Sequence, residues 1–406
     1  MTYQIAAYFP EWQGQRPYSA RVIDQAGLAQ KITVINYAFG MPGPDDSGQR
    51  VVCRFRDAAA AYQRSYAPEE SVDGRGDQPD QPLRGHFNQL RQLKARHPHL
   101  KLVASLGGWT DSTWFSDAAR TPEARQTFVA ACLDTYIHGH LPRENGAGGP
   151  GAAAGLFDGI DIDWEYPLAG GLPNMHTHPA DPANFVLLLA EFRRQYAAIG
   201  RPDLLLTAAL PGPAQAAQFN SDQAHAYLDW VALMTYDLRG DWHPITGHHT
   251  NLYNADLDPA PPAERLSADA TVRVYRDRFG VPPEKLLLGA AFYGKGWNAV
   301  GPQQNGLFQP GQPLGEYSGN YRVLLEKMQR GYQRHWDESA HAPWLYHPGE
   351  QVFITYDDPQ SVAHKAEYVK TNRLGGVMFW ELTGDDDPSS LLTTLYDTLA
   401  GTSPRP

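Results

Sequence analysis

Eight short apolar runs, each about the length of a β-strand, restrict the fold of this 406-residue chain more than any other feature. Stretches with the periodicity of amphipathic helices lie between them. The runs cover residues 5–9, 32–39, 101–106, 158–164, 204–210, 230–236, 286–292 and 375–380. A continuous apolar run is typical of a parallel strand that is covered on both faces. Because such strands alternate with helices, the sequence predicts an α/β chain that forms a (β/α)8 TIM barrel.

Helix starts are marked at four places by a capping residue that is followed by proline. The dipeptides are Thr121-Pro122, Asp181-Pro182, Asp358-Pro359 and Asp387-Pro388. A Thr or Asp side chain can cap the first turn, and proline fits the first helical position. We therefore expect helices to begin at these dipeptides, and we expect the last helix to end at Gly401.

Two stretches in the first half of the chain depart from the alternation. Residues 42–85 are polar and rich in Asp and Gly, and they are too long for a simple connection. Residues 138–155 are rich in Gly and Ala, and we expect them to form a mobile surface loop. No linker to an appended module is visible.

A third stretch, residues 296–352, separates the seventh and eighth runs and carries aromatic residues of its own. They are Phe308, Tyr317, Tyr321, Tyr332, Trp336, Trp344 and Tyr346. We interpret this stretch as a small α+β insertion. The predicted domains are therefore a barrel, formed by residues 1–296 and 353–406, and the insertion, formed by residues 297–352.

The fourth run ends in a row of carboxylates, Asp161, Asp163 and Glu165. Successive side chains of a strand point to opposite faces, so these three share one face while Ile160 and Ile162 share the other. Carboxylates on one face repel one another and resist desolvation. A solvated edge strand would tolerate them, but the apolar flanks argue against an edge. The three acids are therefore candidate catalytic residues, at the carboxyl end of a strand where such barrels place their sites.

Their arrangement restricts the chemistry. Glycoside hydrolysis commonly uses two carboxylates on opposite faces of the sugar. Asp163 and Glu165 cannot flank a sugar, because they lie two residues apart on one strand, about 6.6 Å along it. We infer that Glu165 protonates the leaving oxygen and that a 2-acetamido group of the substrate is the nucleophile. Asp163 would accept the amide N–H and stabilise the resulting oxazolinium ion, and Asp161 and Asp163 would titrate as a pair.

The pattern Asp158-x-x-Asp161-x-Asp163-x-Glu165 resembles the signature of glycoside hydrolase family 18, the family of the chitinases. Four more segments resemble other motifs of that family, in the same order along the chain. They are residues 105–109 (SLGGW), 234–237 (MTYD), 291–297 (AFYGKGW) and 375–381 (GGVMFWE). Residues 297–352 fall where many members carry a chitinase insertion domain. The resemblance thus spans nearly the whole chain and implies the barrel fold.

The resemblance implies four catalytic residues. Glu165 would be the acid and later the base, and Asp163 would hold the acetamido group. Asp161 would partner Asp163 deeper in the barrel. Tyr236 would donate a hydrogen bond to the acetamido carbonyl oxygen.

The resemblance also implies residues that bind the substrate. Tyr8 and Ser105 would hydrogen-bond the deep acid Asp161, Asp237 would hold the sugar, and Trp380 would form the floor under the cleaved residue. The full set of candidate binding residues is Tyr8, Phe39, Ser105, Gly108, Trp109, Met234, Asp237, Trp242, Tyr293 and Trp380. Two positions depart from the family pattern: Lys295 replaces the usual Arg, so we expect a weaker polar contact there, and Ala7 replaces a common Gly without expected harm.

Composition restricts the partners. A net charge of -11 at pH 7 without a basic cluster argues against nucleic acid. No run approaches the roughly 18 apolar residues of a membrane span. The two cysteines and paired loop histidines, such as His248 and His249, give no metal-ligand spacing, so no metal or cofactor is expected. We expect a secreted monomer, and a cytoplasmic location is the alternative because no signal peptide is visible.

Two other functions fit the same fold. A chitin-binding lectin typically lacks the acid glutamate, whereas Glu165 is present. An endo-β-N-acetylglucosaminidase acting on glycoprotein glycans or peptidoglycan would use the same catalytic strand. The insertion and the Trp-rich rim favour chitin or chito-oligosaccharides as the substrate. Endo or exo action and processivity stay open.

Overall fold

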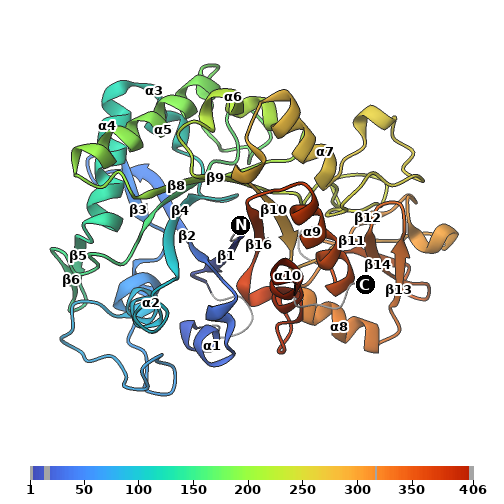
Figure 1. Ribbon diagram of the computed structural model, residues 1–406, viewed down its shortest axis with the longest axis horizontal. Helices are drawn as coiled ribbons and strands as arrows, with labels where there is room; N and C mark the ends of the chain where they lie inside the picture. Colours follow the sequence, from blue (N-terminus) through green and yellow to red (C-terminus); the bar gives the residue numbers. More distant parts are fainter. Residues whose placement is uncertain (1–2, 13–18, 316–317, 402–406) are drawn as a thin grey trace. The chain divides into compact units, whose positions relative to one another are not determined.

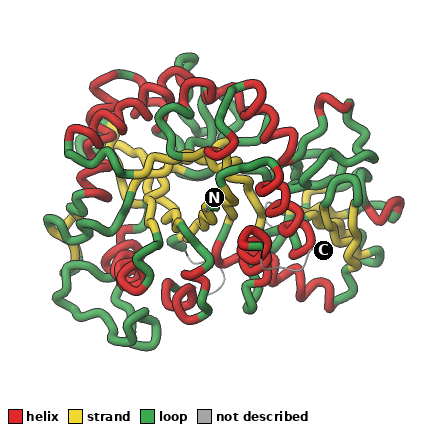
Figure 2. Tube along the Cα trace, viewed as in Figure 1, coloured by secondary structure: helices red, strands yellow, loops and turns green. Residues whose placement is uncertain are grey.

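The structure is a computed structural model that describes residues 3–12, 19–315 and 318–401. Helices and strands alternate along most of these residues (Figures 1 and 2). The largest sheet among them has nine strands in the order β1-β16-β10-β9-β8-β7-β4-β2-β3, and a further pairing joins β1 to β2. This pairing closes eight strands into a ring, while β3 is added to β2 in antiparallel orientation. The chain is thus a (β/α)8 TIM barrel, which confirms the prediction from the apolar runs.

All eight apolar runs form strands of this sheet, and its ninth strand, β3, was not predicted. The strands are β1 (Gln4–Pro10), β2 (Val34–Pro44), β3 (Val51–Phe55), β4 (Lys101–Gly107), β7 (Gly159–Asp163), β8 (Leu205–Leu210), β9 (Trp230–Leu233), β10 (Leu286–Ala291) and β16 (Gly376–Trp380). Strand β7 pairs in parallel with β4 and with β8. In this register Asp161 lies opposite Ser105 on one side and opposite Thr207 on the other. The register therefore aligns three polar side chains across three neighbouring strands.

Three strands end earlier than the apolar runs predict, among them β10, which ends one residue early at Ala291. Strand β9 ends at Leu233, where the N–H of Thr235 bonds back to the Leu233 carbonyl oxygen at 2.8 Å. Strand β7 ends at Asp163, so Glu165 lies in the segment that follows it. The prediction that Asp163 and Glu165 share one strand is therefore wrong. The spacing of about 6.6 Å that an extended strand would give them does not apply.

The chain divides into two compact units, each described here by itself. The acid-strand unit comprises residues 8–210 and 217–231. The insertion unit comprises residues 1–7, 211–216 and 232–406, and so contains the insertion stretch together with several barrel strands. These units do not follow the limits expected for a barrel and an insertion. That expected division stays a prediction.

The helices of the acid-strand unit lie between its strands in sequence. They are α1 (Ala20–Gln25), α2 (Gly85–Arg96), α3 (Phe115–Arg120), α4 (Pro122–Cys132), α5 (Asp181–Ala198) and α6 (Ser221–Ala224). Helix α4 starts as predicted, because the Thr121 side chain accepts the N–H of Ala124. Helix α5 has Ala180 as its N-cap, so the expected cap at Asp181 is wrong. The Asp181 carboxylate instead accepts hydrogen bonds from Ser116 Oγ and from the N–H of His178.

The helices of the insertion unit show one further shift. They are α7 (Ala268–Arg273), α8 (Tyr321–Gln329), α9 (Pro359–Thr371) and α10 (Ser390–Ala400). Asp358 caps α9 as predicted, in a capping box with Ser361. Helix α10 begins later than the expected Asp387, because the carboxylates of Asp385 and Asp386 accept the N–H groups of residues 390–392. Gly401, at φ 75°, ends α10 as predicted.

The two irregular stretches contain regular structure. Residues 138–155 include an antiparallel hairpin of β5 (Leu141–Glu144) and β6 (Ala147–Gly149), so the expectation of a surface loop is wrong. Strand β6 is buried, and a Cβ at Gly148 would clash with the Pro142 carbonyl oxygen. Residues 42–85 supply the end of β2, all of β3 and a π-helical turn at Ala59–Gln63.

The insertion stretch forms its own sheet with an α-helix, α8, in α+β style. Its five strands are β11 (Lys295–Asn298), β12 (Gln312–Pro313), β13 (Gln333–Asp337), β14 (Ala342–His347) and β15 (Val352–Thr355), in the order β12-β11-β15-β14-β13. Trp344 and Tyr346 pack with Trp297 and Phe353 in a buried cluster, and Phe308 packs against it. The aromatic residues of the stretch thus build a local core. Tyr317 lies outside the described residues.

Candidate active site

Asp161 is the most deeply buried acid of strand β7, with no exposed surface. Its carboxylate accepts three hydrogen bonds, from Tyr8 Oη at 2.9 Å, Ser105 Oγ at 2.8 Å and Thr207 Oγ1 at 2.6 Å. Burial raises the pKa of Asp161, and the three donors partly offset this effect. The donors therefore stabilise the ionised form at a position where burial opposes it.

Thr207 is a neighbour of Asp161 that the sequence analysis missed. It lies in the middle of the fifth apolar run, where a threonine is an ordinary strand residue. The register signal was available in principle, because β8 follows β7 in the barrel and Thr207 stands opposite Asp161. Hydroxyl groups from three strands, β1, β4 and β8, thus surround this one carboxylate.

Asp163 lies on the same face of β7 as Asp161 and is 4% exposed. Its Oδ1 atom is buried and has no hydrogen-bond partner among the described residues. Burial raises the pKa of Asp163 well above its usual range, and the charges of Glu165 and Asp161 raise it further. A buried acceptor without a partner costs about 1–3 kcal/mol. Such an atom is a candidate for contact with a ligand.

Glu165 follows β7 and is held through its backbone. Its N–H donates to Ser112 Oγ at 3.0 Å, and Ser112 Oγ donates to the Gly108 carbonyl oxygen at 2.8 Å. The N–H of Gly108 donates in turn to the Asp163 carbonyl oxygen at 2.8 Å. Glu165 is 9% exposed. The segment after β4 therefore fixes where the chain carries Glu165 as it leaves the strand.

The two glycines at the end of β4 permit this close approach. Gly107 and Gly108 have φ angles of 106° and 77°, which favour glycine. A Cβ at Gly107 would clash with the Asp163 carbonyl oxygen, and a Cβ at Gly108 would lie 2.6 Å from the Phe39 ring. The backbone of Gly108 and the space beside it therefore permit this approach, and its part in substrate binding stays a prediction.

Several aromatic residues of the acid-strand unit lie next to residues that contact or neighbour these acids. The Phe39 ring lies 6.3 Å from Tyr8 and 6.1 Å from Trp12. Trp109 is 39% exposed, and its ring lies 6.4 Å from that of Tyr166. Trp109 thus presents apolar ring surface that suits a sugar ring, whereas Phe39 is 5% exposed and is buried among its aromatic neighbours. The expected part of Phe39 in substrate binding stays a prediction.

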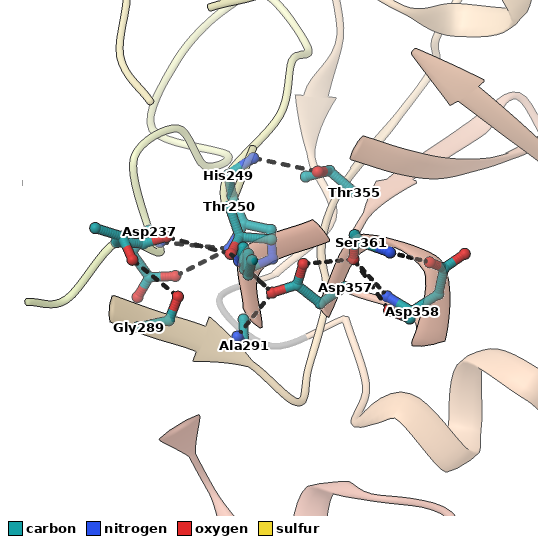
Figure 3. Close-up of polar contacts among 11 residues, drawn as sticks. Asp237, His249, Thr250, Gly289, Ala291, Thr355, Asp357, Asp358 and Ser361 are labelled. Carbon is teal, nitrogen blue, oxygen red and sulfur yellow. Dashed lines mark hydrogen bonds and ion pairs between the residues drawn. The ribbon is translucent and has the colours of Figure 1, made fainter. Parts of the chain in front are cut away.

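The insertion unit holds a second carboxylate cluster, around Asp237. Tyr293 Oη donates to Asp237 Oδ1 at 2.7 Å, and Lys295 Nζ lies 3.5 Å from the same oxygen. His249 Nδ1 also lies 3.5 Å from it (Figure 3). Burial opposes ionisation, but the hydrogen bond with His249 and the charge of Lys295 hold the pKa of Asp237 below its usual value. Its side chain is 42% exposed. Asp237 is therefore a charged, accessible acceptor.

His249 is a partner of Asp237 that the sequence analysis missed. It is fully buried and His248 is 5% exposed, so both lie in a loop, as expected, but with buried side chains. Burial lowers the pKa of His249. The aromatic neighbour Tyr293 lies 5.3 Å from its ring. The pairing with Asp237 is not visible in the sequence, because the two residues are brought together by a loop.

The remaining candidates also lie in the insertion unit. Tyr236 Oη lies 3.5 Å from Met378 Sδ, and Met234 is buried. Trp242 is 55% exposed, and Lys295 Nζ lies 5.3 Å from the centre of its ring. Trp380 is the last residue of β16. Their parts in substrate binding stay predictions.

The described residues offer neither a metal site nor a membrane span. No group of three or more His, Cys, Asp or Glu side chains there could hold a metal ion. Across residues 3–12, 19–315 and 318–401, every helix is too short or too polar to cross a membrane.

Comparisons with known proteins place this geometry in a family. The family model for glycosyl hydrolases family 18 matches residues 4–385. Chitinase A1 of Niallia circulans is 35% identical over 424 residues, which cover 95% of this chain and 57% of the relative. The catalytic domain of psychrophilic chitinase B from Arthrobacter TAD20 has a TM-score of 0.89 at 37% identity, and the match covers 100% of this chain and 97% of that chain. A family 18 N-acetylglucosaminidase from Paenibacillus barengoltzii has a TM-score of 0.74 at 32% identity, and the match covers 98% of this chain and 100% of that chain.

These matches cover most of this chain but a smaller share of the curated relatives. The chain spans little more than half the length of curated relatives that it matches, namely 57%, 56% and 59% of three of them. Within this chain, however, the family match extends from β1 past β16. The chain therefore belongs to glycosyl hydrolase family 18.

Proposed function

We propose that the chain hydrolyses β-1,4 bonds between N-acetylglucosamine units of chitin or chito-oligosaccharides, by substrate-assisted catalysis with retained configuration. The observation that carries this proposal is the buried Asp163 carboxyl, whose Oδ1 has no partner among the described residues. An acetamido N–H is a donor of the kind that this atom lacks. The relatives named as chitinases and as an N-acetylglucosaminidase support the same class of substrate.

In the first step, the carbonyl oxygen of the 2-acetamido group attacks the anomeric carbon. The bond to the leaving oxygen breaks with its electron pair, and Glu165 gives that oxygen its proton. Asp163 accepts the amide N–H, which turns the carbonyl oxygen toward the anomeric carbon. The positive charge of the oxazolinium ion develops beside the Asp163 carboxylate, whose position is fixed at the end of β7, and such a preorganised group is a large source of rate enhancement.

In the second step, water attacks the anomeric carbon and restores the acetamido group. Glu165, now ionised, takes the proton from that water. Each step inverts the anomeric carbon, so the configuration is retained overall. Asp161 shares a proton with Asp163, since two neighbouring buried acids cannot both ionise easily.

The other candidate residues take part in binding within this proposal. Tyr236 donates to the acetamido carbonyl oxygen, and Asp237 accepts hydrogen bonds from sugar hydroxyls. Trp109, Trp242 and Trp380 contact the sugar rings. The exposure of Trp109 and Trp242 supports this assignment, because large exposed aromatic rings often mark binding surfaces.

The product pattern tests the proposal. N-acetylchitohexaose should be cut to shorter oligomers whose new reducing ends first appear as the β-anomer by NMR. A hexamer with free amines in place of acetamido groups should stay intact, because it lacks the nucleophile. Rapid cleavage of that de-N-acetylated hexamer would contradict substrate assistance.

A second activity is favoured by one of the relatives. The N-acetylglucosaminidase from Paenibacillus barengoltzii supports release of single sugars instead of internal cuts. Release of monomer alone from the first minutes of reaction would identify this activity. Parallel incubation with a glycoprotein would detect an endo-β-N-acetylglucosaminidase.

We also propose that the enzyme is a monomer that acts outside the cell. Insoluble chitin cannot cross a cell envelope, which supports an extracellular place of action. Activity confined to washed, lysed cells and absent from the culture medium would contradict this location. Light scattering of the purified chain tests the monomer.

A further inference from the structure

A buried ion pair lies behind the Asp237 cluster in the insertion unit. Lys365 Nζ lies 2.5 Å from Asp357 Oδ2, and the two side chains are 1% and 0% exposed. Asp357 Oδ2 also accepts the Thr250 hydroxyl at 3.0 Å and the N–H of Ala291 at 3.0 Å. Its other oxygen accepts Ser361 Oγ at 2.7 Å (Figure 3). Asp357 is therefore a fully bonded hub that joins the start of α9 to two other segments.

Stability alone is a weak explanation for such a hub. Taking both charges out of water is costly, and a buried pair can often be replaced by apolar residues without loss of stability. Burial lowers the pKa of Lys365, which reflects the same cost of desolvation. Because the pair is costly to bury, we look for a second explanation in the residues that it holds in place.

The bonds of Asp357 lead to the residues that contact Asp237. Ala291 is the last residue of β10, and Tyr293, which donates to Asp237, follows it by two residues. Thr250 directly follows His249, which also contacts Asp237 (Figure 3). The hub thus tethers two partners of Asp237, one on each of two segments.

Thr250 connects the hub to the Asp237 segment itself. Its hydroxyl lies 3.2 Å from the carbonyl oxygen of Thr235, two residues before Asp237. Thr235 Oγ1 in turn donates to the Gly289 carbonyl oxygen of β10 at 2.8 Å. A single hydroxyl at residue 250 is therefore shared between the ion pair and the backbone that carries Asp237.

We propose that Asp357, Lys365 and Thr250 form a positioning group that holds Asp237, His249 and Tyr293 in the arrangement that binds the sugar. None of the three would touch the substrate. The inference rests on the proposed function of Asp237 and extends it to residues for which the sequence analysis made no prediction. Loosening the group would separate Asp237 from its donors and weaken binding.

The pH dependence of binding reports the charge state of Asp237. It would not change if the positioning group only stabilised the fold. Asp237 faces His249, Lys295 and Tyr293, and His249 also feels the charge of Asp357. Burial raises the pKa of Asp237, but these partners lower it below its usual value and so favour the ionised form. If they move away, its pKa rises, and binding that needs the carboxylate is lost at a higher pH.

The experiment compares Thr250→Val with Thr250→Ser. Valine removes the hydroxyl and keeps the shape, whereas serine keeps the hydroxyl. Binding of N-acetylchitohexaose is measured by calorimetry between pH 4 and 8 in a Glu165→Gln background, which is expected to slow turnover strongly. We expect Thr250→Val to weaken binding by roughly twofold to thirtyfold, the range for changes that act through a contact network, and to move its acid limb to higher pH. Thr250→Ser should match the parent.

Other outcomes decide against the proposal. Equal affinity and equal pH dependence of Thr250→Val and the parent overturn it, and so does a serine variant that behaves like valine. If Thr250→Val does not fold, the double variant Asp357→Asn with Lys365→Met replaces it, and parental binding there also overturns the proposal. A parent that does not bind the hexamer, together with a native chain that does not cleave it, refutes the proposed function instead.

Discussion

Asp163 and Asp237 are the same type of side chain with opposite surroundings. Asp163 is buried beside two other acids, and burial together with those charges raises its pKa. Asp237 is partly exposed beside a lysine, a tyrosine and a histidine, which lower its pKa. The neighbours, and not the residue type, therefore decide which carboxyl exchanges a proton and which stays charged. The first suits chemistry, and the second suits the binding of sugar hydroxyls.

The energy terms behind this contrast also differ. The Asp163 Oδ1 atom lacks a partner, so the folded protein carries an unsatisfied group that a ligand can satisfy. Asp237 has its partners already, so a ligand there adds to an existing cluster. We expect substitutions at Asp163 and the neighbouring acids to act mainly on kcat, and those around Asp237 to act mainly on KM. The following experiments test that division.

The largest effect is expected from Glu165→Gln. The amide cannot give a proton to the leaving oxygen, so kcat should fall by about 10² to 10⁴, the range for general acid catalysis. KM for N-acetylchitohexaose should change little, since glutamine keeps the shape. Steady-state kinetics on the hexamer measures both constants. Full turnover by this variant would remove Glu165 from the mechanism.

Asp163→Asn should follow with a loss of about 10² to 10³ in kcat, as for removal of a preorganised electrostatic group. Binding should be largely kept, because the asparagine side chain can still accept the amide N–H. A matched control is Asp158→Asn at the other end of the strand, where the carboxylate bonds Lys94 Nζ at 2.7 Å and the N–H of Leu102 at 2.8 Å. That variant should lower stability and leave kcat near the native value. Equal kcat losses in both variants would mean that Asp163 acts through the fold alone.

The fold could be predicted much further than the site. Eight apolar runs were enough for the barrel, because burial on both faces leaves a direct mark on the sequence. The end of β7 was not predictable, because Ser112 and Gly108, far away in sequence, set where the chain turns. Helix α10 starts late because neighbouring Asp385 and Asp386 cap it, so the correct signal lay just before the proline.

The candidate acids could be picked out by their residue type. Their hydrogen-bond partners were missed where the partner is a common residue such as threonine. The acids of β7 stand out, since a row of carboxylates has no other use in a buried strand. Thr207 and Thr250 do not stand out, because threonine is common in strands and loops for reasons of local structure. His249 and Asp237 meet only in three dimensions. Positions that act through a single hydroxyl or ring nitrogen therefore need coordinates.

Thr207→Val is expected to shift a pH profile more than a rate. The Thr207 hydroxyl is the largest of the three hydrogen-bond effects that lower the pKa of Asp161, against burial that raises it. Without it the pKa of Asp161 rises, so the acid pair becomes fully protonated at a higher pH. The acid limb of kcat/KM should move up by about one pH unit, which corresponds to about 1.4 kcal/mol. Thr207→Ser keeps the hydroxyl and should keep the native profile; an unshifted limb in the valine variant would exclude this coupling.

The smallest effect is expected from Lys295→Met, in the carboxylate cluster around Asp237. Lys295 Nζ lies 3.5 Å from Asp237 Oδ1 and 5.3 Å from the ring centre of Trp242. Methionine keeps the apolar contact and removes the charge, so the pKa of Asp237 should rise and KM should increase by roughly threefold to tenfold, with kcat almost unchanged. The increase should grow as the pH falls, because Asp237 then takes up its proton earlier. Lys295→Arg restores the charge and tests whether the residue usual in the family binds better. A fall in kcat larger than the rise in KM would contradict the division of roles between the two carboxylate clusters.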